Sequence, residues 1–212
     1  MIRLDDVTVI EHGRAILRRV SFDFAPGVWH LAEEHHGDAR LLIDVLAGRR
    51  GVAAGVVRCS GARSWPLAQA ASLGVYLSGL DMIDMLASLY ALERRATQYL
   101  FQDLFDQPEW LPRRFDRWPQ SLQRRFGHIA MLAPVFDVYL IDISPVLPDG
   151  EFYRRWRALF QQRVRGKTVI IASGDHHAAR GDFPGPRLLL AGGSLSRAER
   201  GATPLRPALA AE

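Results

Sequence analysis

The segment 136–143 (FDVYLIDI) constrains the fold more than any other part of the 212-residue chain. It is short, nearly continuous in apolar residues and rich in β-branched side chains, which predicts a parallel strand covered on both faces. Asp142 then lies at the strand's carboxyl end, where open α/β sheets bind their ligands. A carboxylate there is costly unless a cation or hydrogen-bond donors face it. Asp142 is therefore either a cap of the following turn or the metal-side carboxylate of a phosphate-binding enzyme.

Composition narrows the class of protein. The length suits one α/β domain with a small insertion, and 48% hydrophobic with 24% charged residues is typical of globular chains. No apolar run approaches the length of a membrane span, and Asp5 and Asp6 lie where a signal peptide would be apolar, so a cytoplasmic protein is expected. A lone Cys59 excludes an internal disulfide and a cysteine-rich metal site.

The positive charge is dispersed arginine. The formal net charge is +4, and Lys167 is the only lysine in the chain. Such a balance favours anionic lipid head groups or an acidic partner. No basic run is interleaved with aromatic residues, so no nucleic-acid partner is expected.

The hydrophobic pattern of the first 50 residues predicts a hairpin followed by a strand and a helix. Residues 2–10 and 16–24 read as antiparallel strands, and 28–32 as a third, buried strand. A polar stretch with one glycine separates this strand from a helix at 39–47. Strand, polar glycine loop and helix is the order in which a phosphate-binding loop is found.

The remaining segments predict an alternating α/β chain. The predicted elements are a short strand within 51–63, helices at 80–92, 120–132 and 151–164, a small helical part over 93–117, a strand at 168–172 and a hairpin at 188–195.

Three sequence blocks are informative because of their order and spacing along the chain. They are the opening strands 1–7 and 17–24; Ser64-Trp65-Pro66-Leu67, followed by Leu77-Ser78-Gly79-Leu80-Asp81; and 136–142, with Asp149 and Phe152 downstream. In these blocks the chain resembles the ATP-binding subunits of ABC transporters, above all those of capsular-polysaccharide and related glycan exporters. The likeness covers about residues 1–196.

The resemblance implies a P-loop NTPase-like fold of the ABC ATPase type. This is an α/β three-layer core with an N-terminal antiparallel β-subdomain and a small helical subdomain at about 75–130. Beyond the likeness, residues 197–212 are rich in Ala, Pro and Arg, which predicts a flexible tail. The resemblance also implies ATP and Mg²⁺ as ligands, a membrane-spanning ABC transporter subunit as partner, and a location on the cytoplasmic face of the inner membrane. A homologous active ATPase or a second copy of this chain would complete the pair.

The nucleotide motif of this family is dismantled here. A working loop reads G-x-x-x-x-G-K-[ST], in which backbone amides and the lysine hold phosphates and the hydroxyl binds Mg²⁺. Only the Gly37 position is retained, the lysine position falls on Ala39 or Arg40, and the hydroxyl is absent in either register. The degenerate nucleotide-binding positions are Glu34, Gly37, Asp38, Ala39, Arg40 and Leu41.

Acidic residues also surround this loop. Glu33, Glu34 and Asp38 are predicted to bring negative charge towards a phosphate pocket. One such charge about 4 Å from a phosphate costs roughly 4 kcal/mol at an effective dielectric of about 20. Nucleotide binding is therefore not expected, and ATP and Mg²⁺ follow from the resemblance alone.

The resemblance assigns the other motifs to residues that lack the necessary chemistry. Ile143 stands at the catalytic glutamate, Gly174 at the switch histidine and Gly74 at the Q-loop glutamine, while Glu11 replaces an adenine-stacking aromatic. The signature-like pair falls on Gln120-Ser121, where Ser121 replaces the family's glycine. The retained positions are Asp142 as the Walker B remnant and Asp149 as the D-loop-like residue.

The pairs His35-His36 and His176-His177 raise the alternative of a metal site. Adjacent residues on an extended chain point in opposite directions, so neither pair is expected to chelate and no metal site is predicted.

The sequence thus predicts a degenerate nucleotide-binding-domain subunit of a glycan exporter that acts as a non-hydrolysing partner. One alternative is an active ATPase, in which Arg40, Gln69 and the late histidines replace the missing groups. Another is a soluble scaffold or regulator on the same fold.

Overall fold

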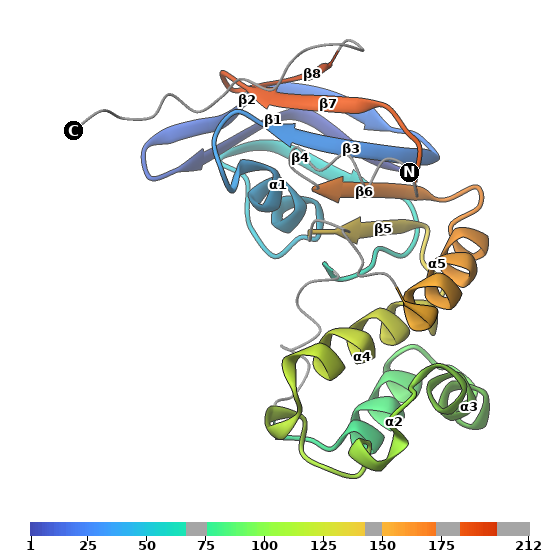
Figure 1. Cartoon of the computed structure of the whole chain (residues 1–212). Helices are drawn as coiled ribbons and strands as arrows, with labels where there is room; N and C mark the ends of the chain where they lie inside the picture. The colour runs from blue at the N-terminus through green and yellow to red at the C-terminus, as the bar shows by residue number, and fades with distance from the viewer. Residues whose placement is uncertain (67–75, 143–149, 173–182, 199–212) are drawn as a thin grey trace.

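The structure is a computed structural model that describes residues 1–66, 76–142, 150–172 and 183–198. Within these residues the strands form a three-stranded sheet in the order β2-β1-β4 and a five-stranded sheet in the order β5-β6-β3-β7-β8. Helix α1 lies between the two sheets. The other helices lie on the far side of the larger sheet from α1 and extend past its β5 edge (Figure 1). Helix α1, the larger sheet and the helices on its other face form the three-layer core that the resemblance implied, and the smaller sheet is the N-terminal antiparallel β-subdomain.

The smaller sheet is the predicted antiparallel hairpin with one added strand. β1 (Ile2–Glu11) pairs with β2 (Arg14–Phe24) through a turn at His12 and Gly13, whose φ angles are 48° and 77°. Two consecutive positive φ angles match the twist of a tight hairpin, which explains the glycine. β4 (Ala54–Cys59) pairs with the other edge of β1.

The larger sheet is mostly parallel and brings several strand ends to one edge. β3 (Gly27–Glu33) lies between β6 (Thr168–Ala172) and β7 (Arg187–Ala191), and β5 (Val138–Ile141) pairs with β6, all in parallel. β8 (Ser194–Arg197) is antiparallel to β7. The carboxyl ends of β3 and β5 therefore lie at the same edge.

The buried strand predicted around residue 140 is confirmed, and it contributes to both cores. All four residues of β5 are at most 1% exposed. Val138 and Leu140 pack with α1 and the antiparallel sheet, whereas Tyr139 and Ile141 pack with the helices. This alternation explains why the apolar run has no polar interruption.

The helices match the predicted ranges closely. They are α1 (Asp38–Leu46), α2 (Gly79–Leu89), α3 (Arg94–Leu104), α4 (Gln120–Leu132) and α5 (Glu151–Arg163), with 3₁₀ turns at Pro108–Trp110 and Phe115–Arg117. The predicted helix 80–92 ends early, because Ala91 adopts a φ of 50° and Glu93 begins α3 as its cap. The boundaries of the helical subdomain and the C-terminal tail remain predictions, and residues 199–212 of that tail lie outside the described residues.

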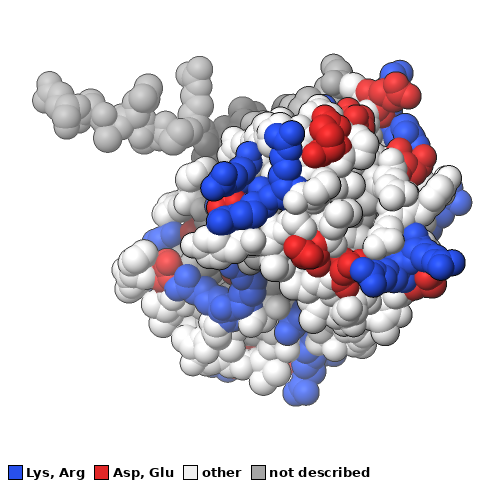
Figure 2. Space-filling view, turned by 90° about the horizontal axis from the view of Figure 1, so that it is seen from below, with Lys and Arg blue, Asp and Glu red and all other residues white. Residues whose placement is uncertain are grey.

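Charges on the helical side are interspersed. Viewed from below, Lys and Arg side chains lie in small groups beside Asp and Glu (Figure 2). Several are ion pairs across or within the helices: Arg94–Asp84, Arg125–Asp106, Arg155–Asp103 and Arg114–Asp116. In the part of the chain that the structure describes, no helix has the length and hydropathy to cross a membrane.

Candidate functional site

The predicted loop joins the end of β3 to the start of α1. Gly37 is the N-cap of α1 and has a φ of 95°, a left-handed conformation that glycine adopts without strain. The buried face of α1, which includes Leu42 and Leu46, packs against both sheets. The glycine offers no side-chain hydrogen bond to the first amides of α1. A helix start of this kind is where a P-loop protein would bind phosphate.

A carboxylate of the chain itself accepts a hydrogen bond from one of these amides. Glu33, the last residue of β3, accepts a hydrogen bond from the Ala39 backbone N–H, with 2.7 Å between N and Oε2. The Glu33 side chain is only 15% exposed, and its other oxygen lies 3.5 Å from the fully exposed His36 imidazole. The anion at this helix start is therefore internal.

Asp38, the first residue of α1, is also paired. Its two carboxylate oxygens accept hydrogen bonds from the Arg14 guanidinium at 2.8 and 2.5 Å. The Asp38 side chain is 8% exposed and that of Arg14 is 44% exposed. Arg14 begins β2, so this bidentate pair links the antiparallel sheet to α1.

The two candidates for the lysine position, Ala39 and Arg40, differ in their exposure to solvent. Ala39 is buried, whereas the Arg40 side chain is 60% exposed and its Nε lies 3.7 Å from Asp142 Oδ2. The Asp142 side chain is 0% exposed. A guanidinium therefore faces the carboxylate that the resemblance assigns to the Mg²⁺ side, and Leu41 supplies no hydroxyl beside it.

Glu34 contacts the larger sheet beyond β3. Its Oε2 accepts a hydrogen bond from the Gly192 backbone N–H at 3.2 Å, in the turn between β7 and β8. Its backbone N–H donates to the Leu190 carbonyl. Parallel pairing of β3 with β7 draws Glu34 to the neighbouring strand, so its charge is held at the β7–β8 turn.

The signature-like pair opens a helix. Gln120 and Ser121 are exposed residues of the first turn of α4, after the N-cap Pro119. No side chain caps this start, and its first turn holds no acidic residue. Leu122, which follows, is buried in the helical core.

Other predicted positions fall into two groups. Ile143, Asp149 and Gly174 lie outside the described residues, as do Gly74, Gln69, His176 and His177. Lys167 pairs with Asp137 at 2.9 Å, beside the amino ends of β5 and β6 and thus at the edge opposite Asp142. At the adenine position, Glu11 pairs with Arg50, and the His12 side chain is 91% exposed.

Arg14 is the residue at this site that the sequence did not predict, and the sequence did not predict the hydrogen bond from the Ala39 N–H to Glu33 either. Arg14 is separated from Asp38 by 24 positions, and no local pattern joins them. A usable signal was the surplus of acids around a glycine-capped helix start, because buried carboxylates require a cation or amide partners.

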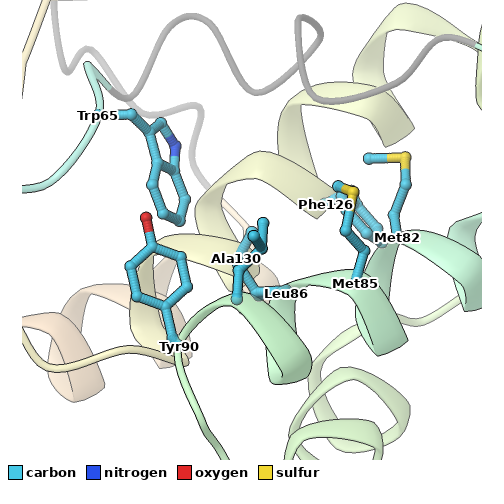
Figure 3. A pocket seen from close by; sticks show the side chains of 8 residues that line it. Trp65, Met82, Met85, Leu86, Tyr90, Phe126 and Ala130 are labelled. Carbon is cyan, nitrogen blue, oxygen red and sulfur yellow. The ribbon is translucent and has the colours of Figure 1, made fainter.

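A second feature is a small apolar pocket beside α2. Trp65, Met82, Met85, Leu86, Tyr90, Phe126 and Ala130 line it (Figure 3), together with Leu89. The pocket is small, with a volume of about 40 Å³. Two of the lining residues are themselves exposed, Leu89 by 67% and Tyr90 by 38%. The predicted helix 80–92 is therefore part core and part apolar surface.

Curated relatives match most of the chain. The capsule polysaccharide export ATP-binding protein CtrD of Neisseria meningitidis serogroup B is 24% identical over 169 residues, which cover 79% of this chain and 78% of CtrD. The ATP-binding protein BexA of Haemophilus influenzae is 23% identical over 179 residues, 82% of each chain. No protein-family model matches.

Solved structures match the fold. The ATP-binding cassette MJ0796, as a dimer bound to ADP and phosphate, superposes with a TM-score of 0.75 at 14% identity, covering 94% of this chain and 98% of that one. An ATP-binding subunit of an ABC transporter superposes with a TM-score of 0.73 at 11% identity, covering 94% and 90%. The chain thus has the P-loop fold of ABC ATPase cassettes and is similar in sequence to the capsule polysaccharide export protein CtrD and to the ATP-binding protein BexA.

Proposed function

We propose that this chain is a degenerate nucleotide-binding-domain subunit of an ABC-type exporter of capsular polysaccharide or a related glycan, and that it acts as a non-hydrolysing partner. The observation that carries the proposal is the contact of Glu33 with the first turn of α1. A carboxylate of the chain takes the backbone amide that a phosphate loop presents to nucleotide. The fold and the relatives support the exporter class.

The remaining chemistry supports the absence of turnover. No lysine is available at α1, and the retained Asp142 faces Arg40. Loss of a general base alone typically lowers a rate by about 10²–10⁴-fold, and loss of one preorganised electrostatic donor by about 10²–10³-fold. Such losses are not additive, but together they leave little rate above background.

The partner would be a membrane-spanning transporter subunit, with this chain peripheral on the cytoplasmic face of the inner membrane. The exposed apolar side chains beside the α2 pocket support a protein contact there, because exposed apolar patches mark interaction surfaces. A homologous active ATPase or a second copy would complete the pair; the dimeric MJ0796 cassette provides the analogy.

Mg-ATP hydrolysis by the purified chain, alone and with its membrane subunit, tests the proposal. We expect no turnover above background and no difference between the natural chain and Asp142→Asn, because Asp142 has no Mg-nucleotide to hold. Turnover that disappears in Asp142→Asn would instead establish the active-ATPase alternative. Co-purification with a cytoplasmic enzyme and no membrane protein would favour the scaffold alternative.

A further inference from the structure

We propose that Glu33 is a built-in substitute for a nucleotide phosphate, and that its contact with α1 keeps this loop closed to free anions. The inference rests on the proposed non-hydrolysing function of the same site. It adds a specific cause: the site is not merely missing ligands for nucleotide, but is held by a group of the chain itself.

The first argument is the chemistry of the contact. Unpaired amides at a helix start attract anions, through their N–H groups and the helix dipole. The Glu33 carboxylate satisfies one of these amides, that of Ala39, at 2.7 Å, the length of a charge-assisted hydrogen bond. Because the Glu33 side chain is only 15% exposed, a free anion cannot reach this amide without displacing it.

The second argument is how the carboxylate is delivered. Glu33 is the last residue of β3, which is hydrogen-bonded to β6 on one side and to β7 on the other. A group on such a fixed strand has little freedom to lose when it binds α1. The intramolecular carboxylate therefore competes with a dissolved anion at a high effective concentration.

The third argument is that the cation side is also internal. The Arg40 guanidinium lies 3.7 Å from Asp142, the carboxylate expected on the Mg²⁺ side. Arg14 likewise compensates Asp38 in the first turn of α1. Phosphate and metal thus each have a counterpart within the chain.

Pyrophosphate in the presence of EDTA is the probe, and thermal unfolding is the readout. We expect no response from the natural chain, because Glu33 blocks the amide. Glu33→Ala should unfold at a lower temperature without ligand and should recover stability as pyrophosphate is added. One charge about 4 Å away changes affinity by roughly a thousandfold, so the pyrophosphate dissociation constant should fall by at least about tenfold.

Glu93→Ala is the matched control. Glu93 also accepts hydrogen bonds from helix-start amides, those of Arg95 and Ala96 at the start of α3. Glu93 is exposed to solvent, whereas the Glu33 side chain is only 15% exposed, so water screens any anion at the start of α3 and the pyrophosphate response of Glu93→Ala should be much smaller than that of Glu33→Ala. Glu33→Gln keeps the side-chain shape and an acceptor, and serves if Glu33→Ala does not fold; it should show the same response with smaller amplitude.

Two results would overturn the inference. One is an equal pyrophosphate response in the natural chain and the Glu33 variants; the other is an equal response in the Glu33 and Glu93 variants. Neither result depends on hydrolysis or on the membrane subunit. If the natural chain lacks turnover but Glu33→Ala gains no pyrophosphate binding, this inference fails while the proposed function stands. If the natural chain hydrolyses Mg-ATP, the proposed function itself fails.

Discussion

At the scale of single residues, His128 is a buried imidazole in α4. Its Nδ1 lies 2.6 Å from the Arg124 carbonyl oxygen, and its ring packs edge-on against Tyr153 and Trp156. Burial lowers the pKa of His128 from 6.5 to about 4. The unfolded chain therefore binds a proton at a higher pH than the folded chain does. His128 accordingly contributes stability that is complete above pH 6.5 and is lost as the pH falls towards 4.

We therefore predict that replacing His128 weakens the acid sensitivity of the fold. His128→Asn removes the titrating group and retains a side-chain amide for the Arg124 carbonyl. Between pH 7.5 and pH 5, the natural chain should lose about 2 kcal/mol more unfolding free energy than this variant. Urea denaturation at the two pH values measures the difference. Identical pH dependence in both proteins would mean that folding does not lower the pKa of His128.

At the scale of elements, the start of α2 explains one of the blocks that carry the family resemblance. Ser78 and Asp81 form a reciprocal capping box, in which each side chain accepts a hydrogen bond from the other's backbone N–H. Gly79 follows the cap and lies against Trp118. A Cβ atom at position 79 would stand 2.6 Å from the Trp118 ring, so this glycine is required for close packing rather than for its backbone angles.

Gly79→Ala should consequently destabilise the helical part of the molecule. Alanine is favoured in a helix interior by about 1 kcal/mol, but overpacking a filled core costs about 1–3 kcal/mol. Trp118 cannot easily move, because Phe105, Phe115 and Phe126 surround it. Gly51→Ala is the control, since nothing lies within 4 Å of a Cβ there. Chemical denaturation should show a net loss of unfolding free energy only for Gly79→Ala. Equal denaturation midpoints for the two variants would show that the Trp118 ring moves to accommodate the added methyl group.

At the scale of the whole molecule, ion pairs join layers that local sequence cannot connect. Arg14 ties β2 of the antiparallel sheet to Asp38 of α1, and Arg40 of α1 faces Asp142 at the end of β5. The first turn of helix α1 is thus paired with both the antiparallel sheet and the larger sheet. The helical side presents a different feature, the exposed apolar end of α2.

That end of α2 should be the docking face for the proposed membrane subunit. Leu89→Asp places a charge on the exposed rim of the apolar pocket and should abolish or greatly weaken co-purification with that subunit. Because Leu89 is 67% exposed, the fold itself should remain intact. Tyr99→Asp is the matched control, since Tyr99 is 70% exposed on α3 and does not line the pocket. Equal retention of the membrane subunit by both variants would exclude this face.

Much of the architecture was predictable because it follows from local rules. An uninterrupted apolar run predicts the strand at residues 138–141. The bounds of α4 and β6 agree with those predicted from the hydrophobic pattern. The loss of the lysine and of the Mg²⁺-binding hydroxyl is likewise visible in the letters at positions 39–42. Neither conclusion needs contacts between distant residues.

By itself, then, the sequence determined the order of the elements and the absence of the usual nucleotide groups. Only the tertiary structure decided what stands in their place. Glu33 and Glu34 are adjacent acids that a sequence pattern cannot distinguish, yet one binds the start of α1 and the other the β7–β8 turn. The reason is physical: successive residues of an extended chain point in opposite directions, and the groups that each carboxylate contacts come from different parts of the chain.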